Sequence, residues 1–345
     1  MIRHSSPTIY SGDLDKIKKV LKSADLINNS AVRSFESRFA KFIRKKFALA
    51  TNSGTAALHL SILSLNIDRH DEVIIPSFVC SAVLNAINYA GAKPVICDID
   101  RESFNLDFAT AKKHITKRTR AIILPHMFGL PAKIDKFLQL NIPIIEDCAQ
   151  ALGAVFKGRK IGSFGLASIF SFYSTKVITT AQGGMLLTGS SQVFKNANDL
   201  IEYDERDNYK IRYNYKMNDL GAALGLSQLE RINAFIKKRR EIARYYNNAF
   251  SKYDIVLPLK EPGHIYYRYV IRIKTPLKKF ISRLEKKGIE AKPPVFNPLH
   301  RYLGLEKRLF PDTEAAFNRA VSLPIYPGLT DKQARFIAQA VLNSL

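Results

Sequence analysis

The sequence has few of the features that mark secreted or membrane proteins. It contains only three cysteines, Cys80, Cys97 and Cys148, which lie far apart without CxxC spacing, so neither a disulfide framework nor a zinc site is indicated. No run of about 18 apolar residues could cross a bilayer, and the first residues lack the apolar core of a signal peptide. We therefore expect a cytoplasmic protein without a membrane span.

Acidic residues are also scarce. The 30 Asp and Glu residues stand against 53 Lys and Arg, which gives a formal net charge of +23. Such an excess could bind nucleic acid, a membrane surface or a phosphorylated substrate. The basic runs are scattered beside helical apolar periodicity, which is typical of solvated helix faces, and we favour that interpretation over nucleic-acid binding.

The periodicity of the chain predicts an α/β fold. From about residue 47 to 190, short β-branched runs alternate with helical stretches, which favours a mostly parallel sheet covered by helices. The runs are nearly all apolar, as expected for strands buried on both faces. Polar residues cluster after their carboxyl ends, where ligands bind in open α/β sheets.

Three units are expected along the 345 residues. Residues 31–235 form the large domain, and residues 236–345 form a smaller α+β domain. Residues 1–30 are helical and apolar-striped, and we expect them to pack on the small domain. Asn218 can cap one long or bent helix that leaves the large domain.

Residues 51–55, TNSGT, join a buried strand to an apolar helix. A turn with glycine at a helix start exposes backbone N–H groups and the positive end of the helix dipole, which suits a phosphate. Ser and Gly also cap helices where no ligand is bound, so this motif alone leaves both interpretations open.

Two carboxylates, Glu146 and Asp147, end the apolar run IPIIED. A carboxylate there could hold a cationic ring nitrogen, bind a metal or cap the next helix. No second cluster of His or carboxylate stands at ligand spacing, so a metal is the least favoured of the three. Gln150 follows Asp147 by about one helical turn, so both could contact one ligand.

Lys176 ends the segment SIFSFYSTK, where it follows an apolar strand, and it precedes Gly183-Gly184. A desolvated lysine has a lowered ammonium pKa, and its neutral amine attacks aldehydes. Most lysines are solvent-exposed, so on its own Lys176 could equally be a surface residue.

Together, a phosphate cradle, a strand-end Asp and a later lysine are the parts that a pyridoxal phosphate site needs. At this point the chain resembles the DegT/DnrJ/StrS sugar aminotransferases, a group of fold-type I pyridoxal-phosphate enzymes. The resemblance spans nearly the whole chain and rests on motifs that include SGTAALHL, DEVIIPSF, LPHMFGLPA, IEDCAQALGA, FSFYSTK, GGMLLT, YNYKMNDLGAALG and LPIYPGL. It implies a large domain built on a seven-stranded, mostly parallel sheet between helices.

The resemblance also assigns roles to residues. Lys176 would carry the cofactor as a Schiff base and move the proton, and Asp147 would hold the pyridine nitrogen protonated. Gln150 would face the ring near its phenolic oxygen. The remaining cofactor contacts would come from a set of phosphate ligands: Gly54, Thr55, Ser171, and Asn214 of a neighbouring subunit. A homodimer with shared active sites follows from the last of these.

Other positions are less clearly assigned. Cys80 stands where many family members place an aromatic ring over the cofactor, which puts cofactor stacking in doubt. His300 and Tyr326 are candidate substrate residues, with packing in the small domain as the alternative. His126 is either a structural histidine or a substrate contact.

The resemblance predicts transfer of an amino group from L-glutamate to a keto sugar. The expected acceptor is a nucleotide-diphosphate-linked 3- or 4-keto-deoxysugar. A cyclitol or another cyclic ketone is the alternative acceptor. Some members of the family are sugar dehydratases with histidine in place of the lysine, and Lys176 argues against that branch. A regulatory or nucleic-acid-binding protein that keeps the fold is the alternative of another class.

Overall fold

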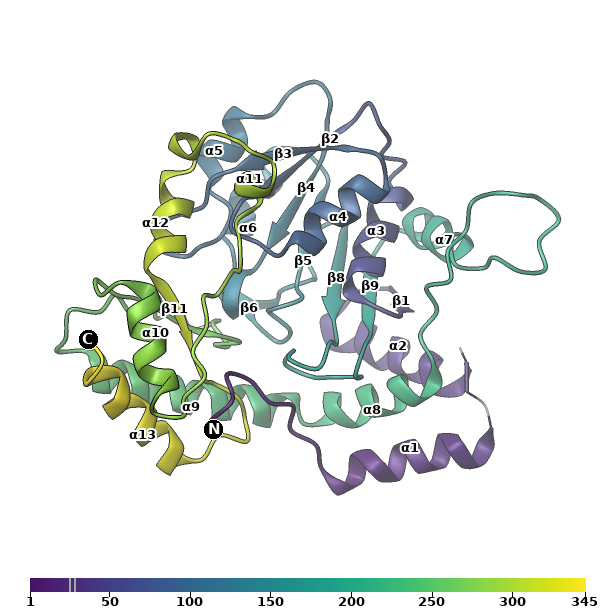
Figure 1. Cartoon of the computed structure of the whole chain (residues 1–345). Helices are drawn as coiled ribbons and strands as arrows, with labels where there is room; N and C mark the ends of the chain where they lie inside the picture. Colours follow the sequence, from purple (N-terminus) through teal and green to yellow (C-terminus); the bar gives the residue numbers. More distant parts are fainter. Residues whose placement is uncertain (25, 28) are drawn as a thin grey trace.

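The computed structural model describes residues 1–24, 26–27 and 29–345. The strands of its main sheet are β1 Phe47–Thr51, β2 Glu72–Pro76, β3 Lys93–Cys97, β4 Thr119–Pro125, β5 Ile144–Asp147, β8 Ala167–Ser171 and β9 Gly184–Thr188. In the described part of the chain they form one seven-stranded sheet in the order β1-β9-β8-β5-β4-β2-β3 (Figure 1). Strand β9 is antiparallel to β1 and β8, and the other pairs are parallel. The predicted mostly parallel sheet is confirmed.

Helices cover both faces of this sheet. One face carries α3 Gly54–Ser64, α4 Ser81–Tyr89 and α7 Ser191–Asp199; the other carries α2 Ser30–Ile43, α5 Phe108–Lys113, α6 Ile134–Leu138 and α8 Asp219–Glu230. Side chains alternate between the faces along each strand. In β1, Leu49 packs in the core under α3, whereas Ala48 and Ala50 pack in the core under α2. Both faces are apolar, so the strands read as continuous apolar runs.

Short elements follow the carboxyl ends of two central strands. The turn Met127–Gly129 follows β4, and the hairpin of β6 Val155–Phe156 and β7 Arg159–Lys160 follows β5. Within Met127–Gly129, Phe128 has a positive φ of 58°. Its N–H donates to Gln150 Oε1 at 2.9 Å, so the turn is tied to the end of β5.

The small domain has its own core. It consists of α9 Ile232–Phe250, β10 Tyr269–Arg272, α10 Leu277–Glu285, α11 Leu299–Tyr302, the turn Lys307–Leu309, α12 Pro311–Arg319, β11 Ala320–Leu323 and α13 Asp331–Leu342. Strand β10 pairs antiparallel with β11, and aromatic side chains such as Tyr246 and Tyr269 fill the space beneath them. Strand β11 was not among the expected elements. No helix among the described residues is both long and apolar enough to cross a membrane.

The long helix expected after Asn218 is two helices, α8 and α9, that meet at Arg231. Asn218 caps α8, since its Oδ1 accepts the Gly221 N–H at 2.8 Å. The expected domain boundary, between residues 235 and 236, falls inside α9, and the division of the chain into domains stays a prediction.

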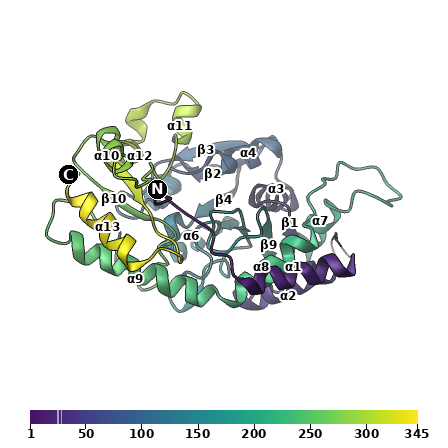
Figure 2. The same cartoon turned by 60° about the horizontal axis from the view of Figure 1, so that its bottom comes forward.

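The N-terminal segment differs in part from its expectation. Residues 1–4 do lie on the small domain: Ile2 pairs with Ile289, and His4 Nε2 is 2.8 Å from Ser322 Oγ. Helix α1 Ser11–Ser23, however, packs along α8 (Figure 2). Buried Asp13 pairs there with Arg231 and accepts a hydrogen bond from Gln228 Nε2 at 3.0 Å. The expectation that this helix packs on the small domain is corrected, because its buried charge finds its partners at the end of α8.

Helix α8 packs closely against α2 at Gly225. A Cβ at Gly225 would lie 2.7 Å from the Phe35 ring and 2.9 Å from Thr180 Cγ2, both of which are held in the core. We predict that Gly225→Ala lowers the free energy of unfolding by about 1–3 kcal/mol through overpacking. Gly12→Ala in α1 is the matched control, because its Cβ meets only Arg231 at 4.0 Å; we expect it to be neutral or stabilising by up to ~1 kcal/mol. Urea denaturation of both variants checks this, and equal midpoints would contradict it.

Candidate active site

A cavity of about 370 Å³ lies where the carboxyl ends of β4, β5 and β8 meet the N-terminal ends of α3 and α4. It brings together most of the candidate residues from the sequence: Gly54, Thr55, Cys80, His126, Asp147, Gln150, Ser171 and Lys176. Three further candidates, Asn214, His300 and Tyr326, are not among the described residues that line it. The carboxyl edge of the sheet is therefore the site, as the strand pattern predicts.

The α3 end of the cavity offers backbone donors. Ser53 caps the helix by accepting the Ala56 N–H at 3.1 Å, and the N–H groups of Gly54 and Thr55 belong to the first turn, which has no acceptor within the helix. A Cβ at Gly54 would lie 2.8 Å from Ser171 Cβ, so only glycine allows this close approach of α3 to β8. The result is a cradle of N–H groups and hydroxyls at the positive end of a helix, which suits a phosphate.

Asp147 lies opposite that cradle, at the end of β5. Its carboxylate is 8% exposed, and Oδ1 accepts the Ala149 N–H at 3.0 Å. Burial raises the pKa of the Asp147 carboxyl, although the Ala149 N–H and the charge of Lys176 oppose the shift. A buried carboxylate with so little compensation favours a cationic ligand such as a protonated ring nitrogen.

Glu146 precedes Asp147 and has a different environment. Neighbouring residues of a strand point to opposite faces, and Glu146 is fully buried away from the cavity lining. Oε1 accepts the N–H groups of Phe164 and Gly165 at 2.8 and 2.6 Å, and Oε2 accepts that of Gly162 at 2.7 Å. Burial opposes its charge, but the His126 contact and these N–H groups hold the pKa of the Glu146 carboxyl below its ordinary value. Of the two carboxylates, Asp147 lines the cavity and Glu146 does not.

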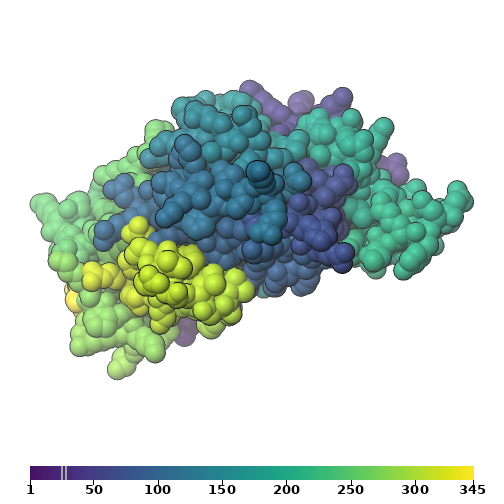
Figure 3. All heavy atoms as spheres, turned by 90° about the horizontal axis from the view of Figure 1, so that it is seen from above, coloured from purple at the N-terminus to yellow at the C-terminus, as the bar shows by residue number. Residues whose placement is uncertain are grey.

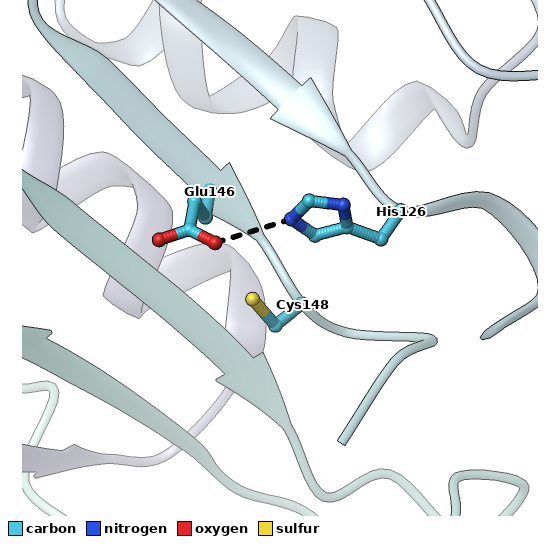
Figure 4. Close-up of side chains that lie close together, drawn as sticks. All are labelled: His126, Glu146 and Cys148. Atoms are coloured by element: carbon cyan, nitrogen blue, oxygen red, sulfur yellow. Dashed lines mark hydrogen bonds and ion pairs between the residues drawn. The ribbon is translucent and has the colours of Figure 1, made fainter. Parts of the chain in front are cut away.

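His126 joins Glu146 and Cys148 in a buried cluster (Figure 4). Its Nε2 is 3.3 Å from Glu146 Oε2, and its Nδ1 accepts the Ala132 N–H at 3.0 Å. Candidate ligand atoms of the three residues lie within 4.8 Å of one another. Both ring nitrogens of His126 and both oxygens of Glu146 are already hydrogen-bonded, so the cluster supports the strand ends. His126 lines the cavity without a free ring nitrogen for a substrate, which favours the structural interpretation.

His300 and Tyr326 have packing roles in this structure. The His300 ring is fully buried, stacks on Phe310 at 4.4 Å and uses both nitrogens, with Nδ1 2.7 Å from Ser77 Oγ and Nε2 2.9 Å from Glu314 Oε1. Tyr326 is buried in the core of the small domain. The packing alternative therefore fits both residues, and neither position corresponds to a contact inside the cavity.

Lys176 follows β8, and its Nζ lies 5.4 Å from the centre of the Tyr267 ring. Tyr267 comes from the segment before β10, so the small domain reaches the lysine at this point. Sequence analysis missed Tyr267, because its contact with Lys176 joins residues that are far apart in the chain. It also missed Tyr173 and Gln182, which line the cavity. Tyr173 lies inside the motif FSFYSTK, but the motif alone assigned it no role.

Two further wall residues have defined orientations. Gln150 Oε1 accepts the Phe128 N–H, which leaves its Nε2 as the free donor. Cys80 is the N-cap residue of α4 and is exposed, unlike Cys97 and Cys148. A small, solvent-exposed side chain thus stands on one wall where a ring could have closed it.

An anion cradle, a buried acid and a lysine around one cavity fit pyridoxal phosphate, whose phosphate, ring nitrogen and aldehyde these groups complement. The fold and the site thus define a pyridoxal-phosphate-dependent transferase. The model of the DegT/DnrJ/EryC1/StrS aminotransferase family matches residues 7–342. The chain belongs to this family and is a pyridoxal-phosphate-dependent sugar aminotransferase.

Known proteins resemble the chain over nearly its full length. GDP-perosamine synthase of Escherichia coli O157:H7 is 34% identical, covering 97% of this chain and 96% of the relative. The structure of DesV from S. venezuelae has a TM-score of 0.91 at 29% identity, covering 96% and 93% of the two chains. Spr1654 of Streptococcus pneumoniae, described as a sugar aminotransferase and solved in its PMP form, has a TM-score of 0.94 at 26% identity, covering 99% and 97%.

Asp147→Asn should separate stability from cofactor binding. An acid whose pKa is raised by folding costs stability above its unfolded pKa of about 3.9, and that cost disappears below it. We predict that the cofactor-free variant melts at a higher temperature than cofactor-free wild type at pH 7, with the difference shrinking towards pH 4. Loss of the charged partner should weaken pyridoxal phosphate binding roughly 10- to 100-fold. Melting curves and cofactor titrations measure the two effects, and unchanged cofactor affinity would refute the role given to Asp147.

Proposed function

We propose that the protein transfers an amino group from L-glutamate to a keto sugar linked to a nucleoside diphosphate. The observation that carries this proposal is the placement of Lys176, Asp147 and the α3 cradle around one cavity. The cofactor, when bound, supplies an electron sink for the charge that develops at the donor's α-carbon. The protein then has to hold the cofactor, position the substrates and move one proton.

Each wall of the cavity has a part in that task. Backbone N–H groups of Gly54 and Thr55, with the Thr55 and Ser171 hydroxyls, would bind the phosphate. Asp147 would stabilise a positive charge on the ring nitrogen, and the Nε2 of Gln150 would donate to the phenolic oxygen. Lys176 would hold the aldehyde through its Nζ, and its free amine would move a proton at the donor's α-carbon.

The nature of the acceptor is supported by charge and by relatives. A nucleotide diphosphate sugar is an anion, and the net charge of +23 raises the local concentration of anions around the protein. The name of the Escherichia coli relative refers to a GDP-linked product. These observations favour a nucleotide-linked keto sugar over an uncharged cyclitol, and we expect the reaction to take place in the cytoplasm.

We further propose a homodimer in which Asn214 of one subunit completes the cavity of the other. Asn214 is exposed, and its carbonyl oxygen accepts a hydrogen bond from the Asn52 side chain at 3.1 Å. The segment between α7 and α8 that leads to it projects from the body of the protein (Figures 1 and 3). It exposes Tyr209 (96%) and Ile211 (66%), apolar surface that a second copy of the chain would cover.

The half-reaction with the donor tests the proposed activity. Glutamate should convert the visible absorption band of the bound pyridoxal form into the band of the pyridoxamine form, whereas Lys176→Ala protein should not complete the conversion. Pyridoxamine-form enzyme is then mixed with dTDP-, UDP- and GDP-linked 3-keto and 4-keto sugars, and with a cyclic ketone lacking the nucleotide. We expect one nucleotide-linked sugar to restore the original band. Restoration by the cyclic ketone alone, or a Lys176→Ala protein as fast as wild type, would overturn the proposal.

Hybrid dimers test the role of Asn214. Asn214→Ala alone should bind the cofactor more weakly, because a phosphate donor is lost. In a hybrid of Asn214→Ala and Lys176→Ala subunits, a shared site places both defects in one cavity and leaves the other intact. At a cofactor concentration too low to load the Asn214→Ala protein, random mixing should then restore about a quarter of wild-type activity. If Asn214 acts within its own subunit, every hybrid cavity carries one defect and no activity returns, and wild-type cofactor affinity of Asn214→Ala would also contradict the assignment.

A further inference from the structure

Tyr267 is the centre of an unusual group of cations. Lys176 Nζ lies 5.4 Å from the centre of its ring, Arg268 Cζ lies 5.4 Å from it, and Arg239 Cζ lies 5.9 Å from it. All three distances are within the range of a cation–π interaction, which a desolvated site strengthens. Tyr267 is buried in an apolar cluster, so its ring is shielded from water where these cations approach it.

The position of Tyr267 is fixed from several sides. Arg239, itself buried, donates from Nη1 to the Tyr267 carbonyl oxygen at 3.0 Å and to that of Ile325 at 2.8 Å. On either side of Tyr267, the backbone is hydrogen-bonded to the turn after β4. Before it, the Ile265 N–H donates to the Gly129 carbonyl oxygen at 3.1 Å. After it, the Arg268 N–H donates to the Phe128 carbonyl oxygen at 3.3 Å. Such a ring is held firmly enough to orient a flexible lysine.

The hydroxyl of Tyr267 contacts the residue before Lys176. Burial raises the pKa of Tyr267, but the charges of Lys176 and Arg268, a hydrogen bond with the Thr175 side chain and the charge of Arg239 bring the pKa down to about 8. Two other titratable groups lie nearby. Burial and the charge of Arg268 lower the pKa of His4 to about 3, so His4 stays neutral. Asp147 interacts with Lys176 from the cavity.

We propose that Tyr267 is a positioning residue for Lys176, whose nitrogen it holds over the face of its ring beside the cavity. This inference rests on the proposed role of Lys176 as the cofactor-binding lysine. It adds that α9 and the segment before β10 set the orientation of a lysine that lines the cavity of the large domain. The Tyr267 ring contributes through its electron-rich face, and the hydroxyl contributes mainly above the pH at which it ionises.

The test is a pH titration of the visible absorption band of the purified holoenzyme without substrates. Removal of the ring in Tyr267→Leu removes a cation–π contact with the Lys176 nitrogen. Such a contact is worth about 3- to 30-fold in the equilibrium between the protonated and neutral nitrogen, so the midpoint should fall by roughly 0.5–1.5 pH units. Tyr267→Phe keeps the ring and should keep most of the wild-type midpoint. In steady-state assays, Tyr267→Leu should lower kcat while KM changes little, because substrate contacts are intact.

Controls separate this proposal from a loss of packing. Phe235→Leu removes a ring from the same buried cluster without reaching Lys176, and it should leave the midpoint unchanged. An unmoved midpoint in folded Tyr267→Leu, or an equal shift in Phe235→Leu, would overturn the proposal. If Tyr267→Leu does not fold, Tyr267→Phe decides. A fall of its midpoint as large as the one expected for loss of the ring, measured below pH 7 where the hydroxyl is not ionised, would overturn the proposal. Retention of the wild-type midpoint would support it. A wild-type protein that shows no visible band with pyridoxal phosphate would instead refute the proposed function.

Discussion

The hydrogen bonds of Glu146 are the constraint on which the site depends. Four donors, three backbone N–H groups of residues 162–165 and the ring of His126, saturate this buried carboxylate and fix the end of β5. Asp147, the next residue, then has to face the cavity with one backbone N–H as its hydrogen-bond donor. A strand end thus carries one carboxylate that is satisfied by the protein and one that is left for a ligand. The pleat of the strand points the first into the protein and the second into the cavity.

The opposite side of the cavity is set by close backbone packing. A Cβ at Gly184, at the start of β9, would lie 2.3 Å from the Ser53 carbonyl oxygen, and one at Gly54 would meet Ser171. Glycine at both positions lets β9 and β8 approach the first turn of α3, which brings its N–H groups to the strand ends. Lys176 lies in the connection between the same two strands. The antiparallel strand β9 therefore matters for function, since it turns the chain back beside the phosphate cradle immediately after the lysine.

Local patterns predicted what depends on a single element. Apolar runs predicted the seven strands of the main sheet, and the sheet type predicted that a ligand site lies at its carboxyl edge. The roles of Asp147 and Lys176 came from their combination with the phosphate cradle and from the family resemblance. The sequence could not separate Glu146 from Asp147 by type, although the alternation of a strand would have assigned them opposite faces. Tyr267, the packing of His300 against Ser77 and Glu314, and the placement of α1 along α8 all depend on contacts between distant segments. Such contacts leave no periodic signal in the chain.

The wall of the cavity at Cys80 is open to solvent. The Cys80 side chain is short and exposed at the cavity, so on that wall the protein supplies little surface to exclude water. Electrostatic contacts in a site strengthen as water is removed, and a wall left open has to be closed by the substrate or by a second subunit. A nucleotide sugar is large enough to fill such a space, and the projecting segment between α7 and α8 carries exposed apolar side chains that could cover it from a partner. An open wall and a protruding segment with exposed apolar side chains are the two features on which the proposed homodimer rests.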